Sequence, residues 1–152
     1  MTPAPARLVV DVSADGVRVP VALARVREAC ARVLRAERVR DALVSIAFVT
    51  ERRMAALNRE HLQHAGPTDV ISFGFAPTTT GSGLVGDIYI CPAVARANAL
   101  AHGERIRDEL LRLVVHGTLH VAGHEHPETE DRTASPMWKR QERLMRTLVR
   151  AS

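Results

Sequence analysis

Four of the seven histidines in this 152-residue sequence fall within the segment HGTLHVAGHEH, residues 116–126. His116 and His120 are spaced so that a helix would place their Cβ atoms about 5–6 Å apart on one face. Two imidazoles at this spacing can bind one Zn²⁺ at about 2.0–2.1 Å. Gly123 can take a positive φ, end the helix and turn the chain, so that His126 approaches the same ion. The segment therefore predicts a metal site with three histidine ligands.

The pattern HxxxHxxGxxH has the histidine and glycine spacing of the metzincin zinc motif, which leaves one coordination position open for water. That motif carries a glutamate general base directly after its first histidine, whereas this sequence has Gly117. The spacing thus predicts a zincin-like site without the base of a protease. Three roles are open for His124: a fourth ligand, a hydrogen-bond donor to a ligand, or a surface residue. We favour the two non-ligand roles. Three roles are also open for Glu125, which could orient an imidazole, act as a base or be solvated.

A second notable segment runs from Leu57 to Phe73 and contains GPTD at residues 66–69, which is typical of a turn leading into a strand. Asn58, Thr68 and Asp69 are expected to cap and brace this turn. Asp87 is expected to be a turn residue at the start of a later strand. We therefore interpret all four residues as structural.

Hydrophobic periodicity and turn signals predict the elements that must position these residues. Strands are predicted over residues 8–12, 42–49, 70–73 and 84–90. Helices are predicted from Pro20, after Thr50, over residues 92–102 and 106–121, and from Ser135 onward. The order β-α-β-α-β-β-α-α-α predicts a single α+β domain over residues 1–152, with a mixed sheet of about four strands and about five helices packed on it.

Composition excludes several classes of protein. Hydrophobic residues make up 46% and charged residues 25%, close to the globular average, which excludes wholesale disorder. No run approaches about 18 apolar residues and the N-terminus lacks a signal-peptide pattern, so we expect a cytoplasmic protein without membrane contact. Cys30 and Cys91 have no CxxC spacing and are expected to be buried small hydrophobes. The net charge of +4 weakly favours a polyanionic partner.

Three motifs taken together resemble the YbeY family of metal-dependent endoribonucleases in order and spacing: PTDVISF at residues 67–73, GDI at residues 86–88, and the histidine segment. Met137 with Gln141-Glu142 also resembles the terminal helix of that family. The resemblance implies one zinc ion per chain, held by His116, His120 and His126 as the catalytic centre. It further implies a role in maturation of the 3′ end of small-subunit ribosomal RNA and in ribosome quality control.

The sequence departs from the family at positions expected to contact RNA. Many members have Tyr-Asp where this chain has His124-Glu125, an arginine thought to contact RNA phosphate where it has Leu62, and a lysine where it has His64. Candidates for the missing contact are His64 and nearby arginines such as Arg59.

The whole pattern predicts a zinc-dependent, single-strand-preferring endoribonuclease of ribosomal RNA. Small ribosomal subunit proteins and an assembly GTPase are its further expected partners, and no DNA is expected. Attack by activated water and attack by the RNA 2′-OH both stay open. One alternative is a zinc hydrolase of amide or ester bonds, supported by the metzincin spacing. The other is a non-catalytic ribosome-assembly module whose structural zinc would be closed by a fourth protein ligand.

Overall fold

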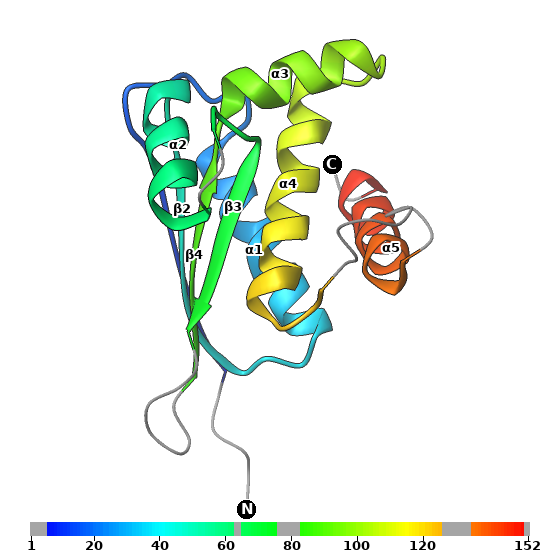
Figure 1. Cartoon of the computed structure of the whole chain (residues 1–152). Coiled ribbons are helices and arrows are strands. Elements are labelled where there is room, and N and C mark those ends of the chain that lie inside the picture. Colours follow the sequence, from blue (N-terminus) through cyan, green and yellow to red (C-terminus); the bar gives the residue numbers. More distant parts are fainter. Residues whose placement is uncertain (1–5, 63–64, 76–82, 126–134, 151–152) are drawn as a thin grey trace, which may run out of the picture.

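The computed structural model describes residues 6–62, 65–75, 83–125 and 135–150 (Figure 1). The order of strands and helices is the predicted one, with a π-helix, η1, added after α2, and the predicted α+β fold is confirmed. No helix in this part of the chain is long and apolar enough to cross a membrane. The elements are β1 (Arg7–Ala14), α1 (Leu23–Ala36), β2 (Asp41–Phe48), α2 (Glu51–Leu57), η1 (Asn58–Leu62), β3 (Val70–Phe75), β4 (Leu84–Ile90), α3 (Pro92–Ala101), α4 (Ile106–Val121) and α5 (Pro136–Arg150).

The four strands form one mixed sheet in the order β1-β2-β4-β3. β1 pairs with β2 and β2 with β4 in parallel, whereas β3 pairs with β4 antiparallel. Parallel neighbours require a crossover connection, and α1 lies within the one between β1 and β2. Because β3 stands last in the strand order, it is an edge strand. It contacts α4, the helix that carries the histidine pair.

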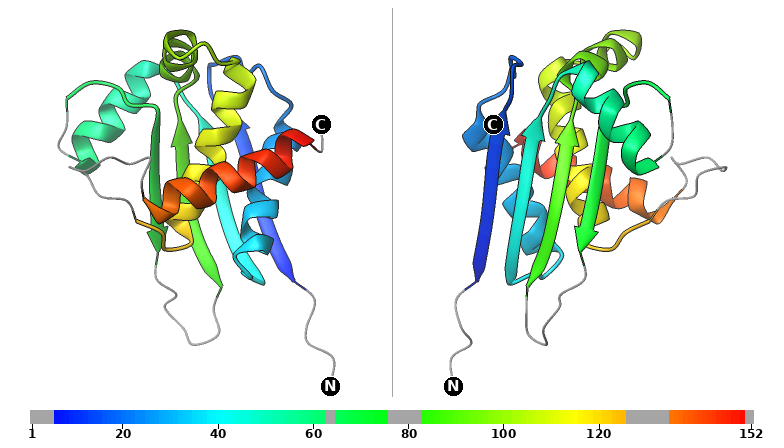
Figure 2. Two further views of the ribbon diagram at one scale, coloured as in Figure 1. Left: turned by 90° about the vertical axis from the view of Figure 1, so that its right-hand side faces the viewer. Right: turned by 60° about the vertical axis from the view of Figure 1, so that its left-hand side comes forward.

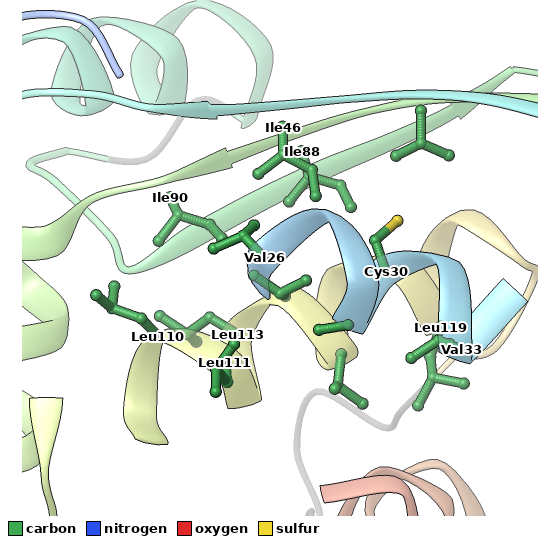
Figure 3. Close-up of a cluster of buried hydrophobic side chains, with 14 of the residues drawn as sticks. Val26, Cys30, Val33, Ile46, Ile88, Ile90, Leu110, Leu111, Leu113 and Leu119 are labelled. Atoms are coloured by element: carbon green, nitrogen blue, oxygen red, sulfur yellow. The ribbon is translucent and has the colours of Figure 1, made fainter. Parts of the chain in front are cut away.

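Helices cover the two faces of the sheet unequally. Figure 2 shows α1 and α4 on one face, with α5 crossing over their outer side, and α2 on the opposite face. The main core fills the space between the sheet and the helices α1 and α4 (Figure 3). Val26 and Cys30 of α1, Ile88 of β4 and Leu119 of α4 are all fully buried in it. Burial raises the pKa of the Cys30 thiol to about 11, against the opposing effect of a hydrogen bond with Thr118. Cys91 is buried as well, so the expected role of both cysteines is confirmed.

Glycines on both sides of the interface let α4 lie close to β3 and β4. Gly74 and Gly86 are paired in register, and a Cβ added at Gly74 would lie 3.3 Å from the carbonyl oxygen of Val121 in α4. A Cβ at Gly86 would collide with the Val121 side chain, and one at Gly117 would lie 2.8 Å from Cγ2 of Ile88. Larger residues would push the helix away from the sheet, because packed interiors leave no spare volume. Gly117 therefore has a packing role.

Side-chain caps mark the starts of two helices as predicted. The Thr50 hydroxyl accepts a hydrogen bond from the backbone N–H of Arg53 at the start of α2. Ser135 accepts one from the backbone N–H of Trp138 at the start of α5.

The end of α4 also follows the prediction. Gly123 has a φ of 104°, and the N–H groups of Gly123 and His124 donate to the carbonyl oxygens of His120 and Leu119. This paired arrangement is a Schellman motif, which requires the left-handed conformation that glycine adopts without strain.

Three local predictions are wrong. α1 begins at Leu23 rather than Pro20, because the backbone of Ala22 is extended, with φ −61° and ψ 134°. The helix after Thr50 changes at Asn58 into the π-helix η1 rather than continuing as an α-helix. Asp87 lies inside β4, where it pairs with Phe73 and Ser45, and is not a turn residue.

Candidate metal centre

α4 carries His116 and His120 side by side in an open cleft. Their ring centroids are 4.7 Å apart and the ring planes meet at 77°. This is the one-turn neighbourhood that the spacing predicts, and it places four imidazole nitrogens within a small volume. The pair lies on a helix that contacts β3, β4, α1, α3 and α5, so its backbone is held from several directions.

The cleft has a volume of about 940 Å³ and lies between the edge strand and the helices. β3 lines it with Val70, Ile71 and Ser72, and η1 contributes Leu62. Further lining comes from α3, from α5 and from the turn after α4. His116 and His120 both line this cleft.

The third predicted ligand, His126, lies outside the described residues, as does His64. Among the residues that are described, no three His, Cys, Asp or Glu side chains form a group that could hold a metal ion. The chemistry of the two histidines present nevertheless fits zinc, since imidazole nitrogen is a common zinc ligand. His116 also has the hydrogen-bond partner that a ligating imidazole requires, because its Nδ1 lies 2.7 Å from Oε1 of Gln141.

Gln141 comes from α5 and is 1% exposed. The periodicity of α5 includes Gln141 among the apolar positions that face the rest of the protein, so a polar residue in an apolar stripe was the available signal. Its partner could not be read from the sequence, because α5 meets α4 only through tertiary packing (Figure 1).

A charged cluster around Arg112 occupies the wall of the cleft one turn before His116. Arg112 Nη1 lies 2.6 Å from Glu104 and 3.3 Å from Glu109, and its Nε lies 3.0 Å from Glu142. Burial would lower the pKa of Arg112, but the hydrogen bond to Glu142 and the charges of the three carboxylates outweigh it and raise that pKa. Burial, together with a hydrogen bond to Glu104, raises the pKa of Glu109 to about 7. The sequence pattern does not predict this cluster, because its members come from separate segments of the chain.

His124 makes a contact that agrees with a non-ligand role. Its Nε2 is hydrogen-bonded to Glu37 at the end of α1, and the same carboxylate accepts from Arg140 of α5 at 3.0 Å. Burial acts to raise the pKa of Glu37, but the hydrogen bonds from His124 and Arg140 prevail and lower it. Glu125 is exposed at the edge of the cleft.

The segment before β3 is braced by its own polar side chains, as expected. Asn58 is buried and donates to the carbonyl oxygen of Gly66 at 2.9 Å. Asp69 accepts from the backbone N–H of Val70 at 2.8 Å and from the Asn98 amide at 3.3 Å. Thr68 and Asp69 also line the cleft.

Arg59 and Leu62 occupy different positions on η1. Arg59 is exposed and does not line the cleft, whereas Leu62 does line it and is 44% exposed. The position at which the resemblance implies a phosphate-contacting arginine therefore faces the site.

The arrangement defines a class: an α+β protein whose central helix presents a histidine pair to a cleft beside an edge strand. The solution structure of TM1509 from Thermotoga maritima shares this fold, with a TM-score of 0.65 and 27% identity, covering 92% of this chain and 89% of that one.

The family model of Endoribonuclease YbeY matches residues 14–149, and the chain belongs to this family. A relative named Endoribonuclease YbeY from Micrococcus luteus is 37% identical over 139 residues, 86% of this chain and 85% of the relative. Another, from Thermotoga petrophila, is 33% identical over 120 residues, 79% of this chain and 76% of the relative. A third match, to the relative from Kineococcus radiotolerans, spans only 55% of that protein at 39% identity. Family membership classes the chain as an RNA-cleaving hydrolase.

Proposed function

We propose that this protein is a zinc-dependent endoribonuclease that prefers single-stranded RNA. Its task is processing of ribosomal RNA in the cytoplasm, at the 3′ end of the small-subunit RNA, and quality control of ribosomes. Residues 1–152 would serve as one hydrolase domain, working beside small ribosomal subunit proteins and an assembly GTPase. The observation that carries the proposal is the His116–His120 pair in the cleft of a chain from an endoribonuclease family.

His116 and His120 would hold the ion together with His126, the third histidine of the motif. A zinc ion bound by these residues would supply an activated water and positive charge beside a phosphoryl group. Gln141 keeps the His116 ring oriented through Nδ1. The exposed part of the cleft, from Leu62 to Glu125, is the surface along which RNA would lie.

The packing of Gly117 argues against a protease. A glutamate general base at that position would have its side chain directed at Ile88, between α4 and β4, rather than into the cleft. The chain thus has the histidine spacing of a metzincin, but position 117 has no room for the glutamate base of that motif.

The decisive experiment measures cleavage of a single-stranded ribosomal RNA fragment by protein of defined zinc content, beside His116→Ala and a matched control, His61→Ala. His61 is exposed on η1 against Phe73 and does not line the cleft. We expect one zinc per chain and RNA cleavage in the wild type and in His61→Ala, and loss of both in His116→Ala. Activity that persists in His116→Ala would trace to a contaminating nuclease and remove the proposal.

The alternatives predict other outcomes of the same experiment. Hydrolysis of peptide or ester substrates with inert RNA would indicate a zinc hydrolase of amide or ester bonds. Bound zinc without any hydrolysis would indicate a ribosome-assembly module with a structural metal.

A further inference from the structure

A continuous chain of hydrogen bonds connects Arg112 to His116 by way of α5. Arg112 donates from Nε to Oε2 of Glu142 at 3.0 Å and from Nη2 to Oε1 at 3.3 Å. Gln141 donates from Nε2 to Oε2 of Glu142 at 3.0 Å, and its Oε1 faces Nδ1 of His116 at 2.7 Å. Arg112 and His116 are one turn apart on α4, so two adjacent residues of α5 bridge two positions on one face of another helix.

The direction of donation along this chain is set at its Arg112 end. A guanidinium can only donate, and a carboxylate that accepts from it also accepts from the neighbouring amide. The NH₂ group of Gln141 must therefore face Glu142, which leaves its oxygen toward His116. A carbonyl oxygen only accepts, so Nδ1 of His116 carries the proton.

Burial keeps this direction from being lost. Gln141 is 1% exposed, so water cannot replace either partner if the amide turns over. A reversed amide would set its NH₂ group against the N–H of a protonated Nδ1 and its oxygen against the carboxylate of Glu142, leaving the buried amide of Gln141 unsatisfied.

We propose that Arg112, Glu142 and Gln141 form a positioning relay that holds His116 as the Nδ1–H tautomer with a fixed ring orientation. In that tautomer Nε2 bears the lone pair that a metal ligand needs. The inference rests on the proposed function in taking His116 as a metal ligand. None of the three residues touches the reacting atoms; they act through His116.

The tautomer can be read directly by long-range ¹H–¹⁵N NMR of metal-free protein at about pH 8, above the usual imidazole pKa of about 6.5. The His116 signals are identified by their loss in His116→Ala. We expect a protonated Nδ1 and an unprotonated Nε2 in the wild type. A predominant Nε2–H tautomer, or a mixture of the two, would overturn the relay without need of any variant.

The matched variants are Glu142→Ala and Glu104→Ala, which remove the same carboxylate from two partners of Arg112. Glu142→Ala removes the acceptor that holds the NH₂ group of Gln141, so the amide can turn over and present that group to His116. We expect a mixture of the two tautomers in Glu142→Ala, with zinc affinity lower by about 10–100-fold. Glu104→Ala, which lies off the relay, should keep the wild-type tautomer. An unchanged tautomer in folded Glu142→Ala would contradict the proposal.

Measuring both the tautomer and zinc binding distinguishes failure of the relay from failure of the proposed function. A fixed Nδ1–H tautomer that depends on Glu142 supports the relay even in a protein that binds no zinc, in which case the proposed function fails alone. Normal zinc binding with the opposite tautomer overturns the relay alone.

Discussion

Leu62 is the one described residue of η1 that lines the cleft, and its side chain is uncharged. Because its side chain is 44% exposed, a longer polar residue fits there without entering the core. Leu62→Arg should therefore strengthen binding of single-stranded RNA and steepen its salt dependence by about 0.7 in the slope of log K against log salt. The measurement is fluorescence anisotropy with a labelled RNA at several salt concentrations.

The control for this prediction is Leu100→Arg. Leu100 is 83% exposed on α3 and does not line the cleft, so the variant adds the same charge elsewhere. Equal salt slopes in the two variants would show that the gain at Leu62 comes from net charge alone.

Glu109 should make stability depend on pH in an unusual direction. Burial and the hydrogen bond with Glu104 raise its folded-state pKa to about 7 from the ordinary value of 4.5. The folded protein therefore binds more protons than the unfolded chain between these values, and stability falls as pH rises through this window. Glu109→Gln, which cannot ionise, should lose less Tm than the wild type between about pH 5 and about pH 8.

The comparison of Tm slopes is internal, because the two proteins differ only at a residue of the Arg112 cluster. Glu37→Gln serves as the control of opposite sign, since the pKa of Glu37 is lowered by His124 and Arg140 despite its burial. The stability that Glu37 contributes is present above its unfolded pKa and is lost as pH falls through its folded pKa. Parallel Tm curves for wild type and Glu109→Gln would refute the raised pKa.

At the scale of elements, the docking of α4 on the sheet depends on the space at Gly86. A methyl group there would collide with both γ-carbons of Val121. Gly86→Ala should lower stability by about 1–3 kcal/mol, the usual effect of overpacking. For a chain of this length that corresponds to about 2–4 °C in Tm for each kcal/mol.

The double variant Gly86→Ala/Val121→Ala tests whether that contact is the cause. Removing the two γ-carbons makes room for the added methyl group, so the two substitutions together should cost less than the sum of their separate effects. Strict additivity in thermal or urea unfolding would place the effect of Gly86→Ala elsewhere.

Elements also mark where sequence reasoning succeeds and where it stops. The His116–His120 neighbourhood, the Thr50 cap and the left-handed Gly123 depend on residues within one or two turns, so local rules predicted them. The pairing of His116 with Gln141 and the position of β3 at the sheet edge depend on contacts between distant segments. Asp87 was misjudged for the same reason: its place inside β4 depends on partners in β2 and β3.

At the scale of the whole molecule, zinc binding and folding stability should be linked. An ion that binds only the folded protein stabilises it, by about 2.7 kcal/mol at a free concentration of 100 times Kd. Adding zinc to metal-free protein should thus raise Tm by about 5–11 °C. The gain should shrink as pH falls through about 6.5, because protons compete for the imidazoles.

Differential scanning calorimetry with and without zinc measures this linkage. His116→Ala should show no zinc-dependent rise, whereas His61→Ala should behave as the wild type. A rise of the same size at about pH 5 and at about pH 8 would contradict coordination by histidines.

The central position of α4 makes the side of the cleft that carries the histidines more stable than the side that η1 contributes. α4 contacts two strands and three other helices and carries fully buried residues such as Leu110, Val114 and Leu119, whereas Arg59, Glu60, His61 and Leu62 of η1 are exposed. In hydrogen-exchange experiments, amides of α4 should open only with global unfolding, and those of η1 by local fluctuation. The histidine side of the cleft should therefore keep its shape for as long as the protein stays folded. The η1 side, which lines the cleft with Leu62, should open and close many times during that lifetime, so RNA would meet one rigid side and one mobile side.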